Sequence, residues 1–185
     1  GFGIKNGLYP EQIVTSWAAK RIGRAVKWYP ERTDGFLTDY HARDHRMHGE
    51  LALDADGKFL ALRCQTISNM GAYLTGGAPI IPTAGGTRML TNVYRIDAIH
   101  AETQCVFTNT VPIAAFRGAG KPEFCHVVER LVDAAAREMA IDPAELRRRN
   151  MVAPTDFPYT TATGLVYDSG EFAGNMDQAL KLAGR

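Results

Sequence analysis

Long apolar runs are missing from this sequence, and no stretch approaches the roughly 20 residues that a helix needs to cross a bilayer. The basic and apolar regions of a secretory signal peptide are also lacking at the start of the chain. We therefore expect no membrane span. The chain begins at Gly1 rather than at a methionine, within a glycine-rich stretch, which suggests a piece of a longer polypeptide.

Cysteine is scarce, and neither sign of charge is in excess. The three cysteines are too widely spaced for a zinc-binding CxxC pair and too few for a disulfide framework; they are Cys64, Cys105 and Cys125. A reducing compartment, the cytoplasm, is the location we expect. The formal net charge of +1 gives no electrostatic reason to expect nucleic acid as a partner.

What is present is the composition of a folded domain. Hydrophobic residues make up 45% and charged residues 22% of the 185 residues, close to the averages of globular proteins. Strand-like and helix-like segments mix along the chain without strict βαβ alternation. The predicted fold class is therefore α+β, with a mixed sheet and packed helices, rather than a parallel doubly wound sheet.

Apolar residues recur at helical spacing in several segments. The predicted helices are 10–22, closed by Gly23, the stretch after Pro122 with an apolar stripe from Phe124 to Ala135, a short helix over 144–149, and about 174–182. Asp142-Pro143 suits the start of the short helix, in which Leu146 is the expected buried residue.

The clearest strand signal is a hairpin. Segments 50–53 and 59–63 flank Asp54-Ala55-Asp56-Gly57, and an Asp-Gly pair between such runs favours a tight turn. Residues 25–28 read as a short strand, and 95–108 as a longer one. The possible core positions of the longer strand are Ile96, Ala98, Val106 and Phe107. Residues 75–86, rich in glycine and proline, are expected to form a long loop.

Residues Arg117-Gly118-Ala119-Gly120-Lys121-Pro122 join a strand region to the amphipathic helix. Glycines allow a ligand to approach the backbone closely, and a helix N-terminus offers unpaired amides at a positive dipole end. Arg117 adds a permanent positive charge with a planar set of donors. The segment can therefore hold an anionic or oxo-bearing ligand. An ordinary glycine-rich connection with a surface arginine is the alternative.

Two polar clusters receive structural interpretations. His41, Asp44, His45 and His48 do not converge on one face of an extended segment, so we expect salt-bridged surface residues and no metal site. The run 147–149 of three arginines is typical of a solvated helix face. A phosphate-bearing anionic ligand or a partner subunit is the functional alternative for that run.

Ten short segments follow one another in a recognisable order. They are GFGIK (1–5), YPE (9–11), ARDH (42–45), ELALD (50–54), GAY (71–73), VFTNT (106–110), AFRGAGKPE (115–123), ERL (129–131), DPAELRRRN (142–150) and YDSG (167–170). Across essentially the whole chain, this order resembles the molybdopterin-binding large subunit of the xanthine dehydrogenase, aldehyde oxidase and carbon monoxide dehydrogenase family.

The resemblance implies that residues 1–185 are the first part of a molybdopterin-binding domain, whose second cofactor-binding region is absent. By the family pattern, Phe2 and Gly3 lie beside the oxo ligand of a molybdenum-molybdopterin cofactor. Gly118 and Ala119 line the same metal edge through their backbone. Arg117 faces the substrate pocket, where it orients substrate or stabilises developing negative charge.

Two departures from the family pattern narrow the substrate. The carbon monoxide enzymes carry a copper-bridging cysteine after the motif arginine, where this chain has Gly118. The purine enzymes carry a glutamate after the lysine of the first motif, where this chain has Asn6. The resemblance therefore implies an aldehyde or an N-heterocycle as the small-molecule substrate.

In this family a glutamate base assists hydroxylation with water as the oxygen source, and electrons leave through iron–sulfur and FAD subunits. The base lies in a Gly-x-Gly-Glu-type segment, which this sequence does not contain. We therefore expect the chain to need the remainder of the large subunit, and to neither retain cofactor nor turn over alone. A stand-alone protein-binding or assembly module is the alternative function.

Overall fold

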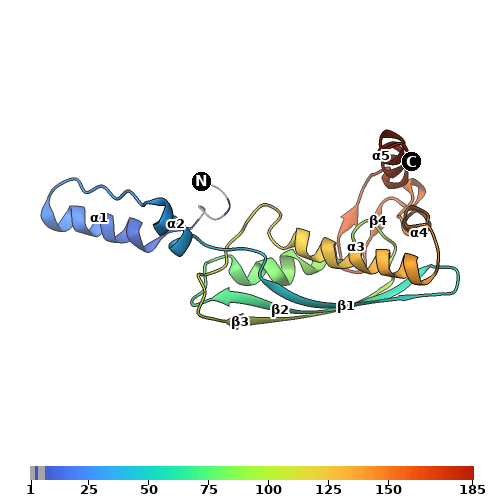
Figure 1. The fold of residues 1–185 in the computed structure, drawn as a ribbon, viewed down its shortest axis with the longest axis horizontal. Coiled ribbons are helices and arrows are strands. Elements are labelled where there is room, and N and C mark those ends of the chain that lie inside the picture. Colours follow the sequence, from blue (N-terminus) through green and yellow to red (C-terminus); the bar gives the residue numbers. More distant parts are fainter. Residues whose placement is uncertain (1–2, 4–6) are drawn as a thin grey trace.

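A three-stranded mixed sheet forms the centre of the protein. The computed structural model describes residues 3 and 7–185. The strands β1 (His45–Leu53), β2 (Phe59–Gly71) and β3 (Ala98–Phe107) lie in that order. β1 pairs with β2 antiparallel and β2 with β3 parallel. The helix α3 (Lys121–Glu138) runs along one face of the sheet (Figure 1). This arrangement confirms the predicted α+β class.

The predicted hairpin joins β1 to β2 and anchors a later helix. The Asp54 carboxylate accepts hydrogen bonds from the backbone amides of Asp56 and Lys58, at 3.0 and 2.8 Å. Gly57 has φ 84°, the left-handed conformation for which glycine was expected. Asn150, at the end of α4 (Pro143–Asn150), donates to the Gly57 carbonyl over 2.9 Å and so ties that helix to the hairpin.

The apolar stripe of α3 forms the core against the sheet, as predicted. Phe124, Val128 and Val132 are fully buried, and they pack with Leu62 of β2 and Leu146 of α4. Full burial of each such side chain contributes about 1.5–3 kcal/mol. The predicted cap of α4 is also confirmed, because the Asp142 carboxylate accepts from the Ala144 and Glu145 amides.

The core positions expected on β3 are partly wrong. Ile96 is buried, but it precedes the strand, whereas Ala98 and Phe107 within the strand are exposed. β3 lies at one edge of the sheet, and α3 covers only one face of that sheet (Figure 1). An apolar residue in such a strand is therefore not necessarily directed into a core.

The glycine- and proline-rich stretch expected as a long loop is instead compact. Residues 75–86 fold into two short helical turns, η2 (Ala78–Ile80) and η3 (Ile81–Gly85), and a third turn, η4 (Thr87–Thr91), follows directly. Ala78, Ile81 and Leu90 within them are buried. Threonine hydroxyls in these turns donate to backbone carbonyls four residues earlier, including Thr83 Oγ1 to the Pro79 carbonyl over 2.5 Å.

The N-terminal helix α1 (Pro10–Ile22) confirms the predicted range, and Gly23 ends it with φ 66°. With α2 (Arg32–Thr38), α1 projects beyond the end of the sheet (Figure 1). Its apolar residues do not enter the core: Val14 and Trp17 are 59% and 60% exposed. The strand expected over 25–28 is absent, since residues 25–31 have no regular secondary structure.

The C-terminal region packs beside α4. It contains the turn η5 (Pro154–Asp156), a two-stranded ribbon of β4 (Tyr159–Thr160) and β5 (Val166–Tyr167), and the predicted last helix, α5 (Phe172–Leu182). Across residues 3 and 7–185, no helix combines the length and apolar character that crossing a membrane requires.

Candidate cofactor-binding loop

The segment before α3 is a tight turn in left-handed backbone conformation. Gly118, Ala119 and Gly120 have φ values of 101°, 45° and 95°. The Ala119 amide donates to the Phe116 carbonyl over 2.7 Å, and the Lys121 amide donates to the Gly118 carbonyl over 3.1 Å. The Ala119 and Lys121 amides are thus both hydrogen-bonded within the turn, and Gly118 is exposed.

Steric crowding explains why glycines flank Ala119. A Cβ at Gly120 would lie 2.2 Å from the Ile81 carbonyl oxygen, and a Cβ at Gly118 would lie 2.5 Å from the Pro122 ring. The Ala119 carbonyl oxygen lies 3.4 Å from the Cβ position of Gly85. The glycine-rich segments 81–86 and 118–120 therefore pack against each other with close backbone contacts. The short helical turns after β2 thus support the loop before α3.

The loop leads directly into the N-terminus of α3, an 18-residue helix whose N-cap is Gly120. No side chain caps this end with a hydrogen bond. The dipole of a long helix places partial positive charge there, which favours an anionic ligand. Arg117, exposed on the same loop, adds a full positive charge.

Arg43 holds the loop from the other side. Its Nη2 donates to the Arg117 carbonyl, and its guanidinium carbon lies 4.8 Å from the centroid of the Phe116 ring. This residue precedes β1 by two positions and has φ 63°, which is rare for a residue other than glycine.

The first glycine-rich motif also reaches this loop. Gly3 has φ 68°, and its Cβ position lies 3.3 Å from the Ala115 carbonyl oxygen. Two of the predicted motifs, separated by most of the chain, are thereby brought together. Phe2 and Asn6, which carry two of the sequence-based predictions, lie outside the described residues.

A family model described as "Molybdopterin cofactor-binding domain" matches residues 1–151. The chain belongs to the molybdopterin cofactor-binding domain family. This finding confirms the resemblance on which the sequence interpretation rests.

Relatives of this molybdopterin cofactor-binding domain are much longer proteins. The "6-hydroxypseudooxynicotine dehydrogenase complex subunit gamma" of Paenarthrobacter nicotinovorans is 35% identical, over 98% of this chain and 23% of that protein. The "Carbon monoxide dehydrogenase large chain" of Hydrogenophaga pseudoflava is 37% identical, over 93% of this chain and 22% of that protein. The chain thus spans less than a quarter of the length of these curated relatives.

The fold is shared with solved structures. The quinoline 2-oxidoreductase of Pseudomonas putida 86 superposes with a TM-score of 0.93 at 35% identity, over 100% of this chain and 24% of that one. An aldehyde oxidoreductase from Desulfovibrio gigas superposes with a TM-score of 0.87 at 27% identity, over 99% of this chain and 19% of that one.

The histidine cluster of this molybdopterin cofactor-binding domain is only partly as expected. His48 does pair with Glu50, over 3.2 Å, at the surface. His45 instead turns inward: neither ring nitrogen is solvent-accessible or has a hydrogen-bond partner among the described residues. Burial lowers the pKa of His45, although Glu123 and Asp44 act in the opposite direction. In the described part of the chain, no group of three or more His, Cys, Asp or Glu residues suits a metal.

The three arginines of α4 are engaged within the protein. Arg147 binds Glu129 and Asp133 of α3, at 2.8 and 2.9 Å. Arg148 and Arg149 both contact Glu145, at 3.0 Å. The expectation of a solvated helix face holds for Arg148 and Arg149, which are exposed, but is wrong for Arg147, which is largely covered and joins α4 to α3.

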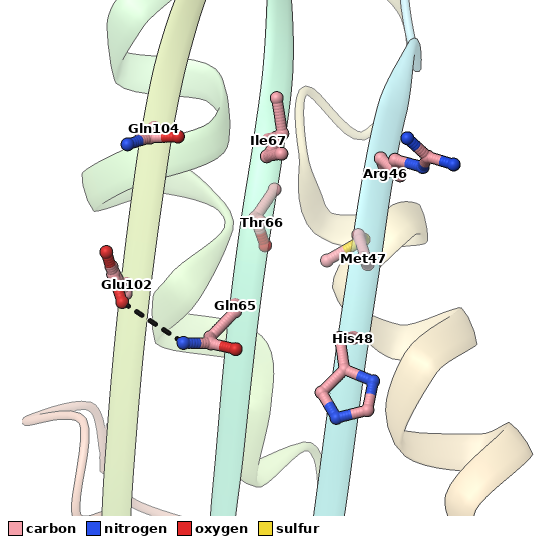
Figure 2. A pocket seen from close by; sticks show the side chains of 8 residues that line it. All are labelled: Arg46, Met47, His48, Gln65, Thr66, Ile67, Glu102 and Gln104. Atoms are coloured by element: carbon pink, nitrogen blue, oxygen red, sulfur yellow. Dashed lines mark hydrogen bonds between the residues drawn. The ribbon is translucent and has the colours of Figure 1, made fainter.

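The uncovered face of the sheet has a hollow, but its side chains do not converge on one point. Polar side chains from all three strands stand side by side there, with Gln65 donating to Glu102 over 3.3 Å (Figure 2). Arg46 and His48 line the same hollow on β1. This face lacks the glycine-lined backbone of the Arg117 loop, which remains the candidate site.

Sequence reasoning missed the role of Arg43. The residue falls inside one of the quoted motifs, so its segment was noticed. Its contact with the Arg117 carbonyl joins positions 74 residues apart, and no local pattern predicts such a pairing. The left-handed backbone conformation of Arg43 could not be predicted from the sequence either.

Proposed function

We propose that this chain is part of a molybdenum-dependent hydroxylase that oxidises an aldehyde or an N-heterocycle with water as the oxygen source. Membership of the molybdopterin cofactor-binding domain family is the main support. The names of its relatives add support, because they include a quinoline oxidoreductase and a nicotine hydroxylase subunit.

The observation that carries the proposal is the meeting of Gly3 with the Arg117 loop. Gly3 and residues 118–120 have left-handed backbone, the Cβ position of Gly3 lies 3.3 Å from the Ala115 carbonyl oxygen, and the loop that follows Ala115 leads to the positive end of α3. An anionic molybdenum-molybdopterin fits this combination of close backbone approach and positive charge. We propose that Phe2, Gly3, Gly118 and Ala119 contact the cofactor. When bound, the cofactor supplies the oxidising centre for the substrate.

Arg117 is the proposed catalytic residue of the chain. Its guanidinium is always charged and presents a planar set of donors. We propose that it orients the substrate and stabilises negative charge that develops as the reacting carbon is attacked. The general base is proposed to come from a further part of the large subunit, since the Gly-x-Gly-Glu-type segment is not in this sequence.

The identity of the residue after Arg117 narrows the proposed substrate class. Gly118 stands where the carbon monoxide enzymes are expected to have cysteine, which disfavours carbon monoxide despite the similarity to a carbon monoxide dehydrogenase large chain. Asn6 likewise disfavours purines. An aldehyde or an N-heterocycle remains as the proposed substrate class.

The proposed partners are the remainder of the large subunit, an iron–sulfur subunit and an FAD subunit. Relatives that carry the names of a complex subunit or a large chain support partner subunits in general. We propose a cytoplasmic location, because Cys64, Cys105 and Cys125 are all unpaired. The chain alone is proposed to neither retain cofactor nor turn over.

The deciding experiment uses the complete large subunit, purified with its partners, and measures molybdenum, pterin and turnover of aldehydes and N-heterocycles. Replacing Arg117 with alanine should lower the chemical rate about 10²–10³-fold, as loss of a transition-state donor does. Arg46→Ala, on the uncovered sheet face, is the matched control and should leave the rate unchanged. A well-expressed complex without molybdenum or pterin contradicts the proposal.

One observation favours a second function, that of a protein-binding or assembly module. Val14, Trp17 and Tyr29 are exposed on the projecting α1 region, and exposed apolar groups of this size suit a partner surface. The metal and pterin analysis separates the two functions. An assembly module purifies with protein partners and without cofactor.

A further inference from the structure

We propose that Arg43 is a positioning residue for the candidate site: it binds the peptide between Arg117 and Gly118, stacks on the Phe116 ring and thereby sets the direction of the Arg117 side chain. The inference rests on the proposed function, because it assigns the clamp to the loop that is proposed to bear the catalytic arginine. Among the described residues, the side chain of Arg43 contacts the Arg117 carbonyl and the Phe116 ring.

Two contacts of one guanidinium define the clamp. Nη2 of Arg43 donates to the carbonyl oxygen of Arg117, and the guanidinium carbon lies 4.8 Å from the Phe116 ring centroid. The hydrogen bond orients the peptide that follows Arg117, and the stacking orients the residue that precedes it. Arg117 is therefore held on both sides by a single planar group.

The backbone that carries Arg43 is itself fixed. On its N-terminal side, the His41 amide donates to the Pro112 carbonyl over 3.0 Å, and the Ala114 amide donates to the His41 carbonyl over 2.9 Å. These bonds join the segment before Arg43 to the segment before the loop. The backbone before Arg43 is thus hydrogen-bonded to the backbone that leads to Arg117.

On the C-terminal side, Asp44 is bound at the end of the sheet. Asn69 Nδ2 donates to the Asp44 carboxylate over 2.7 Å, and the Asn69 amide donates to the Asp44 carbonyl over 3.0 Å. The same Asn69 side chain donates to Thr110 Oγ1 over 2.8 Å. This network holds Arg43 in its left-handed conformation, with φ 63°. Backbone strain of this kind persists where the surroundings determine it, often at functional sites.

Among the described residues, no carboxylate pairs with the charge of Arg43. None of the ion pairs found in residues 3 and 7–185 includes Arg43, whereas Arg63, Arg95 and Arg147 all pair with acidic groups. An arginine retained only for surface charge pairing does not need the strained backbone or the aromatic stack. The partners of Arg43 are the Arg117 carbonyl and the Phe116 ring, and these contacts suit a side chain that positions the backbone at Arg117.

Kinetics of the complete enzyme, assembled with its partners, test the clamp. Arg43→Ala should lower kcat about 10–100-fold with little change in KM, because small misplacements of a catalytic group have effects of this size. Arg43→Lys, which retains a donor for the carbonyl but loses the planar stack, should fall between wild type and Arg43→Ala. Arg46→Ala is the control arginine. Equal kcat for Arg43→Ala and wild type overturns the inference.

A double mutant separates positioning from general destabilisation. If Arg43 acts through Arg117, adding Arg43→Ala to Arg117→Ala should lower kcat by about twofold or less. If Arg43→Ala lowers kcat as much in the Arg117→Ala variant as in the wild type, Arg43 acts independently of Arg117 and the inference is overturned.

Hydrogen exchange provides a readout that does not depend on activity. The Ala119 amide is bonded to the Phe116 carbonyl within the clamped turn, so it should exchange at least about tenfold faster in Arg43→Ala than in Arg46→Ala. If the complex lacks molybdenum, or if Arg117→Ala is fully active, the proposed function fails and this exchange rate alone decides on the clamp. Unchanged exchange at Ala119 overturns it.

Discussion

Replacement of Gly120 by alanine is the sharpest stability test of the interlocked loops. Gly120 has φ 95°, and an alanine held there costs about 1–3 kcal/mol. The new Cβ also lies 2.2 Å from the Ile81 carbonyl oxygen. Because that oxygen belongs to the backbone, relief requires a shift of η3 or α3, and such shifts typically cost about 1–3 kcal/mol. We expect the free energy of unfolding to fall by about 4 kcal/mol.

Urea unfolding followed by circular dichroism measures this loss. With a denaturant slope of about 2–3 kcal/mol/M for a chain of this size, the midpoint should fall by about 1–2 M. Gly118→Ala should have a smaller effect, since its new Cβ meets a proline ring rather than backbone. Gly76→Ala is the control, because nothing lies within 4 Å of its Cβ position. Similar midpoints for Gly120→Ala and Gly76→Ala would refute the steric argument.

Two further predictions concern the core and its buried histidine. Phe124→Ala should lower the free energy of unfolding by about 3–5 kcal/mol, as loss of a buried ring does. Phe36 is 72% exposed, so the control Phe36→Ala should change this free energy by less than about 0.5 kcal/mol. Equal urea midpoints for the two variants would contradict the buried packing of Phe124. His45 has a pKa lowered by burial, so the unfolded chain binds its proton at higher pH than the folded one. Stability should therefore be complete above about pH 6.5 and decline as the pH falls towards the folded-state pKa. His45→Gln should flatten this decline in midpoints measured between pH 5 and 7.5, and an unaltered slope contradicts the assignment to His45.

Local chemistry accounts for the elements that were predicted well. The turn at Asp54–Gly57 depends on a side-chain acceptor and a left-handed glycine within a few residues. The cap at Asp142 likewise bonds amides two and three positions away. The stripe of α3 has the helical period, and its central residues Phe124, Val128 and Val132 are fully buried. In each case the deciding interaction is close in sequence or follows one repeat.

Burial that depends on a distant partner is not determined by the local sequence. The apolar residues of α1 suit a core, yet this helix projects beyond the sheet, and Trp17 stays exposed. Phe107 has the character of a core residue on an edge strand with one uncovered face. The stretch 75–86 has loop composition but folds into turns, because the loop before α3 and the Phe124 ring pack closely against its glycines.

For the candidate site, the sequence by itself identified Arg117 and its glycines as a segment able to hold an anion, and the ordered motifs indicated the family. Only the tertiary structure decided that Gly3 adjoins this segment, that Gly120 must lack a side chain beside the Ile81 carbonyl, and that Arg43 holds the Arg117 peptide. The reason is physical: motifs and capping patterns act over a few residues, whereas close contacts between backbones depend on how remote segments pack together.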